Sequence, residues 1–405
     1  MTRYTIVIFE QNLQRSMDIN IYDTAIAFRS KTNKELKSAY YLFRIMKNRG
    51  LVKTGTKFIM TALKYKLPVS WFIENTIYKQ FVGGKTISEC QKVVDKLKEY
   101  NVRTILDYSV EGNTTPEGME RTLEETLRTI ENAANNQFVP FAVFKPTAFA
   151  SPHLFENAIE GKPFDDMMNS LYNDFQVRVD ILCKRAYELG VPILIDAEES
   201  WYQYLVDETV EKMMEKYNAE KAIVFNTLQM YRHDRIKFLR ESFSRARKGK
   251  YFIGVKFVRG AYMEKERERA MLKGYPSPIC NTKEETDNLY NEALTISLDN
   301  IDIAVIFSGS HNEESNLLLV DEIQRRNLRK DDNRIWISQL YGMSDHISFN
   351  LAHHGFNVAK YVPYGPVMSV MPYLLRRAEE NTAIAGQTTR ELNLLVKEKA
   401  RRKLA

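Results

Sequence analysis

Four residues near the C-terminal end of the chain could together bind an anion: Tyr373, Arg376, Arg377 and Glu380. If residues 366–381 form a helix, these positions are spaced i, i+3, i+4 and i+7 and share one face. Pro366 suits the first turn of that helix, where a missing N–H costs no hydrogen bond. Two adjacent guanidinium groups beside a tyrosine can hold a carboxylate or a phosphate. A solvated surface helix is the alternative for this segment taken alone.

Polar and ionisable residues also follow most of the short apolar runs that we expect to be strands. They are Asp107 and Glu111, Lys145, Asp196 and Glu198, Gln229, Lys256, Arg259 and Tyr262, His311, and Tyr361. In a parallel barrel the carboxyl ends of the strands meet at one face and build the active site. Any single one could be a loop residue that happens to be polar, but the whole series fits that explanation poorly.

Among these residues, Lys145 is the one for which the sequence most strongly indicates a functional role. It closes the apolar run 141–144 and precedes Pro146, so we expect its side chain to point into the barrel mouth. A buried lysine needs an anion beside it or loses its proton more readily. Asp196 is a natural partner. A Schiff-base lysine, as in barrel aldolases, is the alternative role.

His311 lies where the sixth apolar run meets the following helix, beside Gly309 and Ser310. These small residues lower the steric barrier to a phosphate or a ring system at that turn. Taken alone, His311 fits a structural hydrogen-bonding role equally well. The histidine spacings match no metal motif, so we predict no metal site. Glycine-rich dinucleotide and P-loop motifs are missing too, so the barrel itself must hold any cofactor.

The composition is that of an ordinary soluble globular protein, with 44% apolar and 27% charged residues. A net charge of +6 does not require nucleic acid as a partner. Three cysteines far apart argue against a disulfide framework, and Cys183 suits a core position. Apolar runs are too short for a membrane span, and the first residues do not resemble a signal peptide. We therefore expect a cytoplasmic protein.

The pattern of apolar, polar and basic residues along the sequence predicts three regions: a helical arm over residues 1–98, a barrel over 99–387 and a basic C-terminal helix or tail over 388–405. In the arm, apolar residues recur at helical spacing over 33–49, 55–66 and 88–100. In the barrel, predicted strands cover 102–108, 140–145, 192–196, 222–226, 252–258, 303–307, 334–339 and 357–361. Predicted helices cover 116–134, 167–189, 202–217, 228–247, 285–298, 313–326, 345–354 and 366–381.

Eight strand–helix repeats predict a closed parallel (β/α)₈ barrel. The connection over residues 260–282 is longer than a normal loop. Its segment from Tyr262 onward could form an extra helix over the barrel mouth. An insertion at such a place usually shapes a ligand pocket or a lid.

Taken in order, the strand-end motifs resemble those of the proline dehydrogenase family. The motifs are Leu106-Asp-Tyr-Ser-Val-Glu111, Phe144-Lys-Pro-Thr147, Ile195-Asp-Ala-Glu-Glu199, Phe225-Asn-Thr-Leu-Gln229, Val258-Arg-Gly-Ala-Tyr262, Ser310-His-Asn312, Leu340-Tyr-Gly-Met343, Tyr361-Val-Pro-Tyr-Gly365 and Tyr373-Leu-Leu-Arg-Arg377. The resemblance implies a distorted (β/α)₈ TIM barrel that binds FAD noncovalently. It also implies oxidation of L-proline to Δ1-pyrroline-5-carboxylate, with electrons passed to a quinone, in a monofunctional enzyme without an aldehyde dehydrogenase domain.

The resemblance implies roles for individual positions. The proline carboxylate would be bound by Arg376, Arg377 and Lys145. The pocket for the proline ring would be lined by Tyr262, Tyr361 and Tyr373. Asp196 would support Lys145, Glu380 would steady the arginines, and Glu111 could pair with Arg376 when no substrate is bound. The flavin and its dinucleotide would contact Gln229, Lys256, Val258, Arg259, Gly260, Ser310, His311 and Asn312. Some family members carry arginine where this chain has Lys256, so a bidentate grip at that position is in doubt.

Three alternatives stay open at this point. Hydroxyproline or another cyclic imino acid could be the substrate, although Tyr361 would crowd a substituent on the ring. A cofactor-free lyase or aldolase could use Lys145, although it would leave Gln229 and His311 idle. A flavin-free barrel could simply bind carboxylates. The basic segment 388–405 could lie on an acidic membrane surface, but a solvated or barrel-capping helix explains it better. The sequence predicts no oligomeric state.

Overall fold

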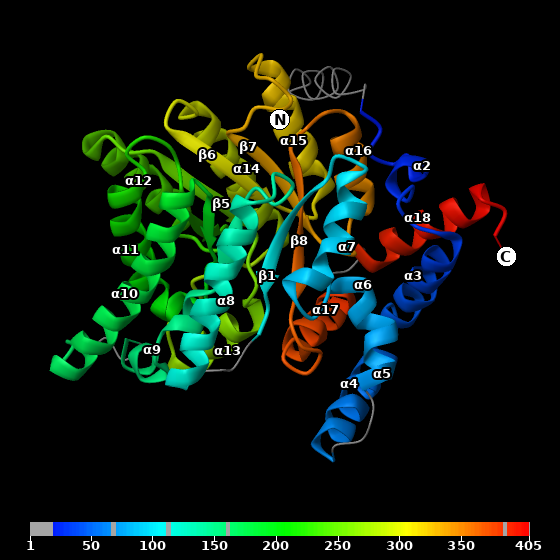
Figure 1. Ribbon diagram of the computed structural model, residues 1–405, viewed down its shortest axis with the longest axis horizontal. Helices are drawn as coiled ribbons and strands as arrows, with labels where there is room; N and C mark the ends of the chain where they lie inside the picture. The colour runs from blue at the N-terminus through cyan, green and yellow to red at the C-terminus, as the bar shows by residue number, and fades with distance from the viewer. Residues whose placement is uncertain (1–18, 66–69, 111–114, 159–162, 384–386, 405) are drawn as a thin grey trace. The chain divides into compact units, whose positions relative to one another are not determined.

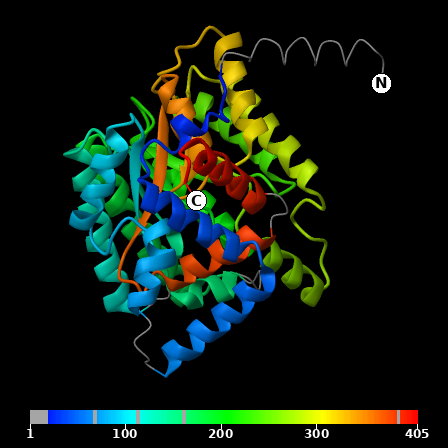
Figure 2. The same cartoon turned by 90° about the vertical axis from the view of Figure 1, so that its right-hand side faces the viewer.

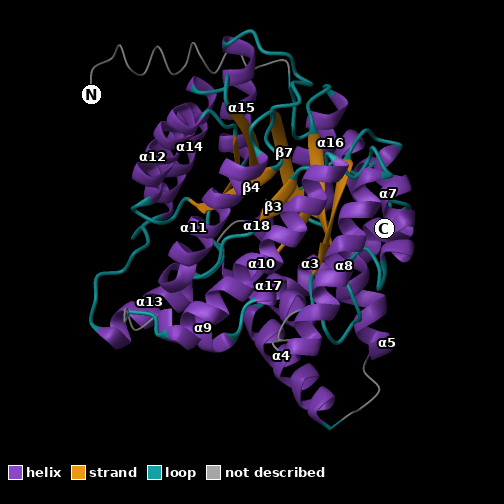
Figure 3. Ribbon diagram, turned by 60° about the vertical axis from the view of Figure 1, so that its left-hand side comes forward, coloured by secondary structure: helices purple, strands orange, loops and turns teal. Residues whose placement is uncertain are grey.

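The computed structural model describes residues 19–65, 70–110, 115–158, 163–383 and 387–404. Eight parallel strands form one sheet in the order β1-β8-β7-β6-β5-β4-β3-β2, and the helices lie around it (Figures 1 and 3). The strands are β1 Arg103–Tyr108, β2 Ala142–Phe144, β3 Ile193–Ile195, β4 Val224–Gln229, β5 Ile253–Val258, β6 Ala304–Gly309, β7 Ile335–Leu340 and β8 Val358–Tyr364. Because β1 and β2 end the strand order, the barrel is nearly closed. The predicted distorted (β/α)₈ barrel is confirmed.

The helices after the strands largely match the predicted segments. They are α8 Pro116–Ala134, α9 Pro152–Ala158, α10 Asp166–Leu189, α11 Ser200–Tyr217, α12 Arg235–Gly249, α13 Met263–Lys273, α14 Lys283–Asp299, α15 Glu313–Arg325, α16 Asp345–His353, α17 Met371–Ala383 and α18 Gln387–Arg401. Local signals explain the agreement. Thr115 caps α8 at the Gly118 N–H, and Pro116 takes the first position. Thr282 and Glu285 form a capping box that starts α14.

The chain divides into two compact units. Unit 1 comprises Met1–Glu111 and Gln339–Ala405, and unit 2 comprises Gly112–Ser338. Unit 2 holds β2 to β6 and the first part of β7. Unit 1 holds β1, β8 and the helices of the arm. The arm helices are α2 Thr24–Ala27, α3 Asn33–Met46, α4 Arg49–Lys64, α5 Ser70–Ile73, the π-helix Glu74–Tyr78, α6 Lys79–Phe81 and α7 Ile87–Lys98.

Aromatic rings fill the interior of unit 2. Phe141, just before β2, packs edge-on against Phe225, Phe307 and Trp336, with ring centroids 5.6, 5.2 and 5.1 Å away. The strand register aligns Lys256 with Phe307, and Phe307 with Trp336. Aligned residues of neighbouring parallel strands point to the same face. Lys256 therefore faces the barrel interior.

The predicted boundary between β4 and its helix was wrong. The helix expected over 228–247 begins at Arg235, and the strand expected to end at 226 continues to Gln229. The extension depends on the neighbouring strand, because Met230 and Tyr231 donate their N–H groups to the Val258 and Arg259 carbonyls at 2.8 and 2.7 Å. Such a contact leaves no mark on local periodicity. The short helix α9 was not predicted for a related reason, since one or two turns show little periodicity.

In unit 1 the arm helices pack around α17. A buried apolar cluster joins Phe28, Phe43, Phe81, Val370, Leu374, Leu394 and Leu395, among others. It draws residues from the arm, from α17 and from α18, and α18 runs beside α3 (Figure 2). From α17 and the turn before it, Val367, Val370, Leu374 and Ala378 are buried in this cluster, and Leu375 packs against it.

The start of α17 differs from the prediction. The helix begins at Met371 rather than after Gly365, and Pro372, not Pro366, lies in its first turn. The preceding residues make a separate turn, in which Ser369 and Val370 donate to the Pro366 carbonyl at 2.9 and 3.1 Å. A proline within the first helical turn needs no N–H partner, so Pro372 costs the helix little.

The C-terminal helix α18 caps unit 1. Its Leu394 and Leu395 are buried in the cluster, and Glu391 accepts a hydrogen bond from the Ser344 N–H at 2.6 Å. Arg402, just after α18, donates to the Phe28 and Lys31 carbonyls at 2.8 and 2.7 Å. These contacts favour the capping alternative for residues 388–405.

A buried ion cluster lies on the outer side of β8 in unit 1. Lys360, in β8, and Lys31, before α3, lie 2.9 and 3.2 Å from the two carboxylate oxygens of Asp345. Burial alone would raise the pKa of Asp345, but the charges of Lys360 and Lys31 outweigh burial and lower it to about 2. Burial lowers the pKa of Lys360. The cluster joins the arm, the start of α16 and β8, and it has no part in the proposed chemistry.

The three cysteines are buried and unpaired, and Cys183 lies in the core as predicted. Among the described residues, no helix combines the length and the apolar character needed to cross a bilayer.

Candidate active site at the carboxyl ends of the strands

Lys256 and Asp196 form a buried ion pair inside unit 2. Lys256 Nζ donates to Asp196 Oδ1 at 2.6 Å, and the two side chains are 7% and 17% exposed. Asp196 directly follows β3, and Lys256 lies in β5, two strands away in the sheet. The predicted pairing of Asp196 with Lys145 stays a prediction. The structure adds Lys256 as a partner, which sequence spacing did not indicate.

Glu198 is a buried strand-end residue for which we predicted no specific role. Thr147 Oγ1 and Tyr262 Oη donate to its two carboxylate oxygens at 2.6 and 2.5 Å. Burial raises the pKa of Glu198 to about 7, although both hydrogen bonds and the nearby charge of Lys145 lower it. The carboxyl group can therefore gain or lose a proton near neutral pH. The sequence signals for Glu198 were its place in the series of strand-end polar residues, two residues after Asp196, and in the motif 195–199.

Helix α13 lies over this part of the barrel, and the predicted extra helix is confirmed. Its Glu266 is fully buried and accepts hydrogen bonds from the Ser200 N–H and Oγ, both at 2.6 Å. Lys265 pairs with Glu199 at 2.9 Å, and the Arg269 guanidinium lies 4.8 Å from the Trp201 ring centre. These contacts fasten α13 to the start of α11. They also hold Tyr262, which precedes α13, over Glu198.

Gln229 uses its amide to join the loops around the site. Its Nε2 donates to the Glu198 carbonyl at 2.6 Å, and its Oε1 accepts from the Ala261 N–H at 2.9 Å. Gly260, directly before Ala261, has a φ of +140°, and a Cβ at this position would lie 2.5 Å from the Tyr231 ring. Only glycine fits this turn. Gln229 and Gly260 thereby shape the loop that carries Tyr262.

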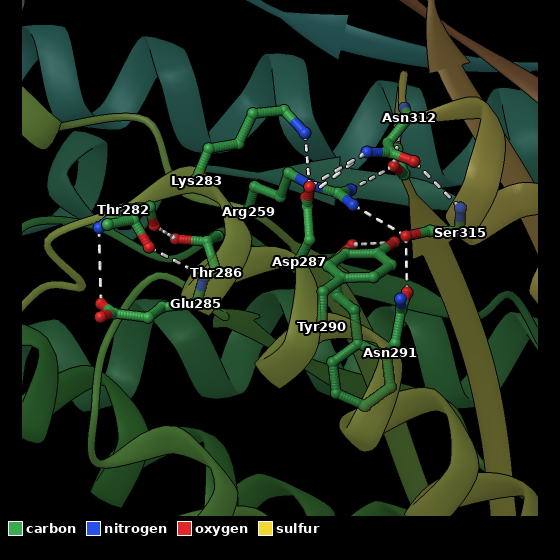
Figure 4. Close-up of polar contacts among 12 residues, drawn as sticks. Arg259, Thr282, Lys283, Glu285, Thr286, Asp287, Tyr290, Asn291, Asn312 and Ser315 are labelled. Atoms are coloured by element: carbon green, nitrogen blue, oxygen red, sulfur yellow. Dashed lines mark hydrogen bonds and ion pairs between the residues drawn. The ribbon is translucent and has the colours of Figure 1, made fainter. Parts of the chain in front are cut away.

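Arg259 is held by acceptors from three sides (Figure 4). Its Nε donates to Asp287 at 2.7 Å, its Nη2 donates to Ser315 Oγ at 2.8 Å, and its Nη1 donates to Ser310 Oγ. Its guanidinium also stacks on Tyr290, 4.4 Å from the ring centre. The network fixes Arg259 against the β6–α15 turn. Three of the predicted cofactor residues therefore lie together, since Asn312 caps α15 at the Ser315 N–H in the same turn.

The predicted residues of unit 1 lie on α17 and β8. Tyr373 is buried and lies 5.4 Å from the Arg377 guanidinium, measured to the ring centre, so these two positions share a face as predicted. Arg376 is the neighbouring residue of α17, and Tyr361 is buried in β8. Glu111 lies outside the described residues, and so does the side chain of Glu380. Their predicted roles stay predictions.

The residues at the strand ends of unit 2 suit a polar ring system that also carries phosphates. Thr227 shares the inward row of Lys256, and its buried hydroxyl makes no hydrogen bond among the described residues. A ligand above this row would meet a hydroxyl group and an ammonium group. The cation of Arg259 and the turn of Gly309, Ser310 and His311 follow on β5 and β6 and suit a diphosphate. Among the described residues, no His, Cys, Asp and Glu group could hold a metal ion.

Comparison with known proteins gives one consistent result. The family model described as proline dehydrogenase matches residues 90–390. A carbapenem biosynthesis protein, CarD of Pectobacterium carotovorum, is 37% identical over 81% of this chain and 84% of its own length. The mitochondrial proline dehydrogenase 1 of Dictyostelium discoideum is 32% identical over 94% of this chain and 74% of its own. A hydroxyproline dehydrogenase of Xenopus laevis is 29% identical over 93% and 88%.

Solved structures give the same fold. The proline utilization A protein of Bdellovibrio bacteriovorus, inactivated by N-propargylglycine, superposes with a TM-score of 0.71 at 19% identity. The match covers 93% of this chain and 41% of that one. The chain therefore spans less than half the length of that larger protein.

Proposed function

The chain belongs to the proline dehydrogenase family, and from that premise we propose that it oxidises L-proline to Δ1-pyrroline-5-carboxylate. The family model spans most of the chain, and two relatives above 30% identity align over most of both sequences. The reaction removes a hydride from the carbon next to nitrogen and a proton from that nitrogen, and a C=N double bond forms. FAD, when bound, supplies the acceptor of the hydride. The protein's own contribution is binding and orientation.

The proposed roles of the side chains follow from the two ends of a proline molecule. Proline is a small zwitterion, whose carboxylate needs cationic donors and whose ring needs an aromatic slot. Arg376, Arg377 and Lys145 would bind the carboxylate. Tyr262, Tyr361 and Tyr373 would contact the ring. Tyr262 donates a hydrogen bond to Glu198, and the Tyr373 ring lies beside the Arg377 guanidinium. These contacts orient the two rings.

Lys256 and Arg259 would provide positive charge beside the FAD. Asp196 fixes the Lys256 ammonium, while Asp287 and two serines fix the Arg259 guanidinium. A cation held in place before the reaction needs no rearrangement when negative charge develops nearby. Gln229, Val258, Gly260, Ser310, His311 and Asn312 complete the proposed FAD contacts.

The observation that best supports the proposal is the set of strand-end groups around Glu198 and Lys256, in a chain of this family. A visible spectrum of the purified protein tests it. We expect flavin bands that bleach under anaerobic conditions when L-proline is added. A protein without flavin would favour the carboxylate-binding barrel, and an unchanged spectrum with proline would exclude proline as substrate.

Hydroxyproline is the second candidate substrate, because a hydroxyproline dehydrogenase aligns along nearly the whole chain. The same anaerobic reduction can be followed with L-proline and with trans-4-hydroxy-L-proline. We expect L-proline to react with the larger kcat/KM, since the buried Tyr361 leaves little room for a ring substituent. A larger value for hydroxyproline would assign the chain to the alternative.

Glu198→Gln is expected to lower kcat/KM for L-proline about tenfold at pH 8, the value of one charge-assisted hydrogen bond. The ionised carboxylate accepts from both Thr147 and Tyr262, whereas a protonated or amidated group does so less well. Because the pKa of Glu198 is raised to about 7, the wild-type advantage should grow as the pH rises through 7 and then level off. Taking the ratio of the two pH profiles removes the ionisation of the substrate amine.

Glu208→Gln, on the exposed side of α11, is the matched control and should leave the profile unchanged. A ratio of wild type to Glu198→Gln that does not vary between pH 6 and pH 8 would refute this role for Glu198.

We also propose that the electrons pass to a quinone, because that is the acceptor the family resemblance implies. Turnover with a short-chain quinone under anaerobic conditions, compared with turnover in air without a quinone, distinguishes the acceptors. Equal rates with oxygen alone would contradict a quinone acceptor.

A further inference from the structure

Helix α10 exposes more large apolar side chains than any other described helix of unit 2. Val177 and Ile181, in its middle, are 49% and 40% exposed, and Met167 and Tyr187, near its two ends, are exposed as well. The outward positions of the neighbouring helix α8 carry mostly glutamate and arginine, as is usual for the solvent side of a helix. Single exposed apolar residues are common, but two branched aliphatic side chains one turn apart form a patch. The proposed chemistry does not use this patch.

The exposed positions of α10 are regularly spaced. The helix packs against α8 and α11 on the outside of unit 2 and buries Phe175, Val179 and Leu182 (Figure 1). Its other side carries a row of exposed residues, here called the α10 seam: Ser170, Asp174, Val177, Ile181, Lys184 and Glu188. The steps between them are alternately four and three residues. This is the spacing with which one helix contacts another along a coiled coil.

The order of residue types along the α10 seam is complementary to itself. Its midpoint lies between Val177 and Ile181, with Asp174 three residues before the first and Lys184 three residues after the second. If two copies of the seam meet antiparallel about a two-fold axis at this midpoint, positions equally far from the midpoint face each other. Val177 then meets Ile181 of the second copy, and Asp174 meets Lys184, each contact occurring twice. In a parallel pairing Asp174 would meet Asp174, and like charges would repel.

The two charges next to the apolar pair differ from the charges beside the seam. Asp180, also on α10, accepts a hydrogen bond from Lys216 Nζ of α11 at 2.8 Å, so its charge is paired within the chain. Asp174 and Lys184, by contrast, form no ion pair with any residue that the structure describes. Both side chains are exposed. They can therefore pair with a second molecule without giving up a contact inside the chain.

We propose that the α10 seam is the contact surface of a homodimer, in which the α10 helices of two copies of the chain pack antiparallel. The aliphatic centre loses contact with water, and the charged pairs on both sides of it set direction and register. A second copy fits better than a different protein, because the seam already carries the complement of its own groups. One helix from each copy makes a small interface, so we expect a reversible dimer at micromolar or higher concentrations. The dimer does not depend on the proposed function.

Sedimentation velocity of the full chain over a range of concentrations tests the dimer. We expect a monomer–dimer equilibrium that added salt weakens, because salt screens the charged pairs. Lys184→Glu places a negative charge opposite Asp174 twice in each dimer, and Asp174→Lys places a positive charge opposite Lys184. Each single variant should raise the dissociation constant of the dimer by at least about tenfold. Far-UV circular dichroism and thermal melting check that the variants fold like the wild type.

A charge-swapped double variant tests the antiparallel register. Asp174→Lys combined with Lys184→Glu restores opposite charges at both antiparallel contacts, so it should dimerise like the wild type. Parallel helices would still bring like charges together in the double variant, and no recovery would follow. Lys237→Glu is the matched control, because it makes the same change of charge at a position of α12 that is 83% exposed. It should dimerise like the wild type.

Three results would each overturn the proposal. A wild-type chain that stays monomeric up to about 200 µM, which allows for weak affinity, would leave the seam to a different protein. A dimer that both single variants keep would place the interface elsewhere on the molecule. Loss of the dimer in Lys184→Glu and Asp174→Lys without recovery in the double variant would refute the antiparallel pairing. Because sedimentation needs no substrate, failure of the proposed proline oxidation would leave these results unaffected.

Discussion

Arg377→Met is expected to lower kcat/KM for L-proline by at least about 100-fold, mainly through a higher KM, while the flavin stays bound. A guanidinium group that grips a carboxylate makes charge-assisted hydrogen bonds, each worth about 1.5–3 kcal/mol. Loss of about 3 kcal/mol corresponds to about a 100-fold effect. Methionine keeps an unbranched stem and a good helix propensity, so α17 should persist. Steady-state kinetics over a range of proline concentrations gives the result, and the visible spectrum reports the flavin.

Arg325→Met is the matched control for this prediction. Arg325 lies near the end of α15, is largely exposed and pairs only with Glu322 of its own helix among its described contacts. The control should show wild-type kinetics. Wild-type kinetics in Arg377→Met as well would refute the proposed carboxylate clamp. Loss of flavin from Arg377→Met would instead place the arginine in cofactor binding.

Asp345→Asn is expected to lower the free energy of unfolding by about 3–5 kcal/mol, the usual result of removing one partner from a buried ion pair. The change leaves the buried Lys360 without its negative partner, at a side chain that is 1% exposed. It also removes a partner from Lys31. Urea denaturation at neutral pH measures the loss, and Asp331→Asn, at an exposed ion pair, is the control that should change little.

The pH dependence of this difference has a definite sign. The pKa of Asp345 falls to about 2 in the folded state, while an unfolded aspartate titrates near 3.9. A lowered pKa stabilises the fold above the unfolded value, and the gain is lost as the pH falls through the folded value. The gap between wild type and Asp345→Asn should therefore be full above about pH 5 and shrink toward pH 2. A gap that stays constant with pH would contradict the buried ionised cluster.

The sequence alone determined the order of the eight strands and their main helices, the fold class and the family. Helix α8 shows why, because the signals that start it, Thr115 and Pro116, are neighbours in the chain. Alternating apolar runs and amphipathic segments are likewise local, and eight of them leave few arrangements other than a barrel. The strand-end motifs that indicate the family are also short runs of neighbouring residues, so they can be recognised in the sequence.

The tertiary structure alone decided the partners of the site residues. Lys256 is 60 residues away from Asp196 in sequence, and Glu198 receives its donors from Thr147 and Tyr262 on either side of it along the chain. Neither contact has a fixed spacing that a sequence pattern could reveal. The same holds for β4, whose end depends on hydrogen bonds to residues at the end of β5. Distances through space decide which charges pair, which are buried and what pKa each group has. These distances exist only after the chain has folded.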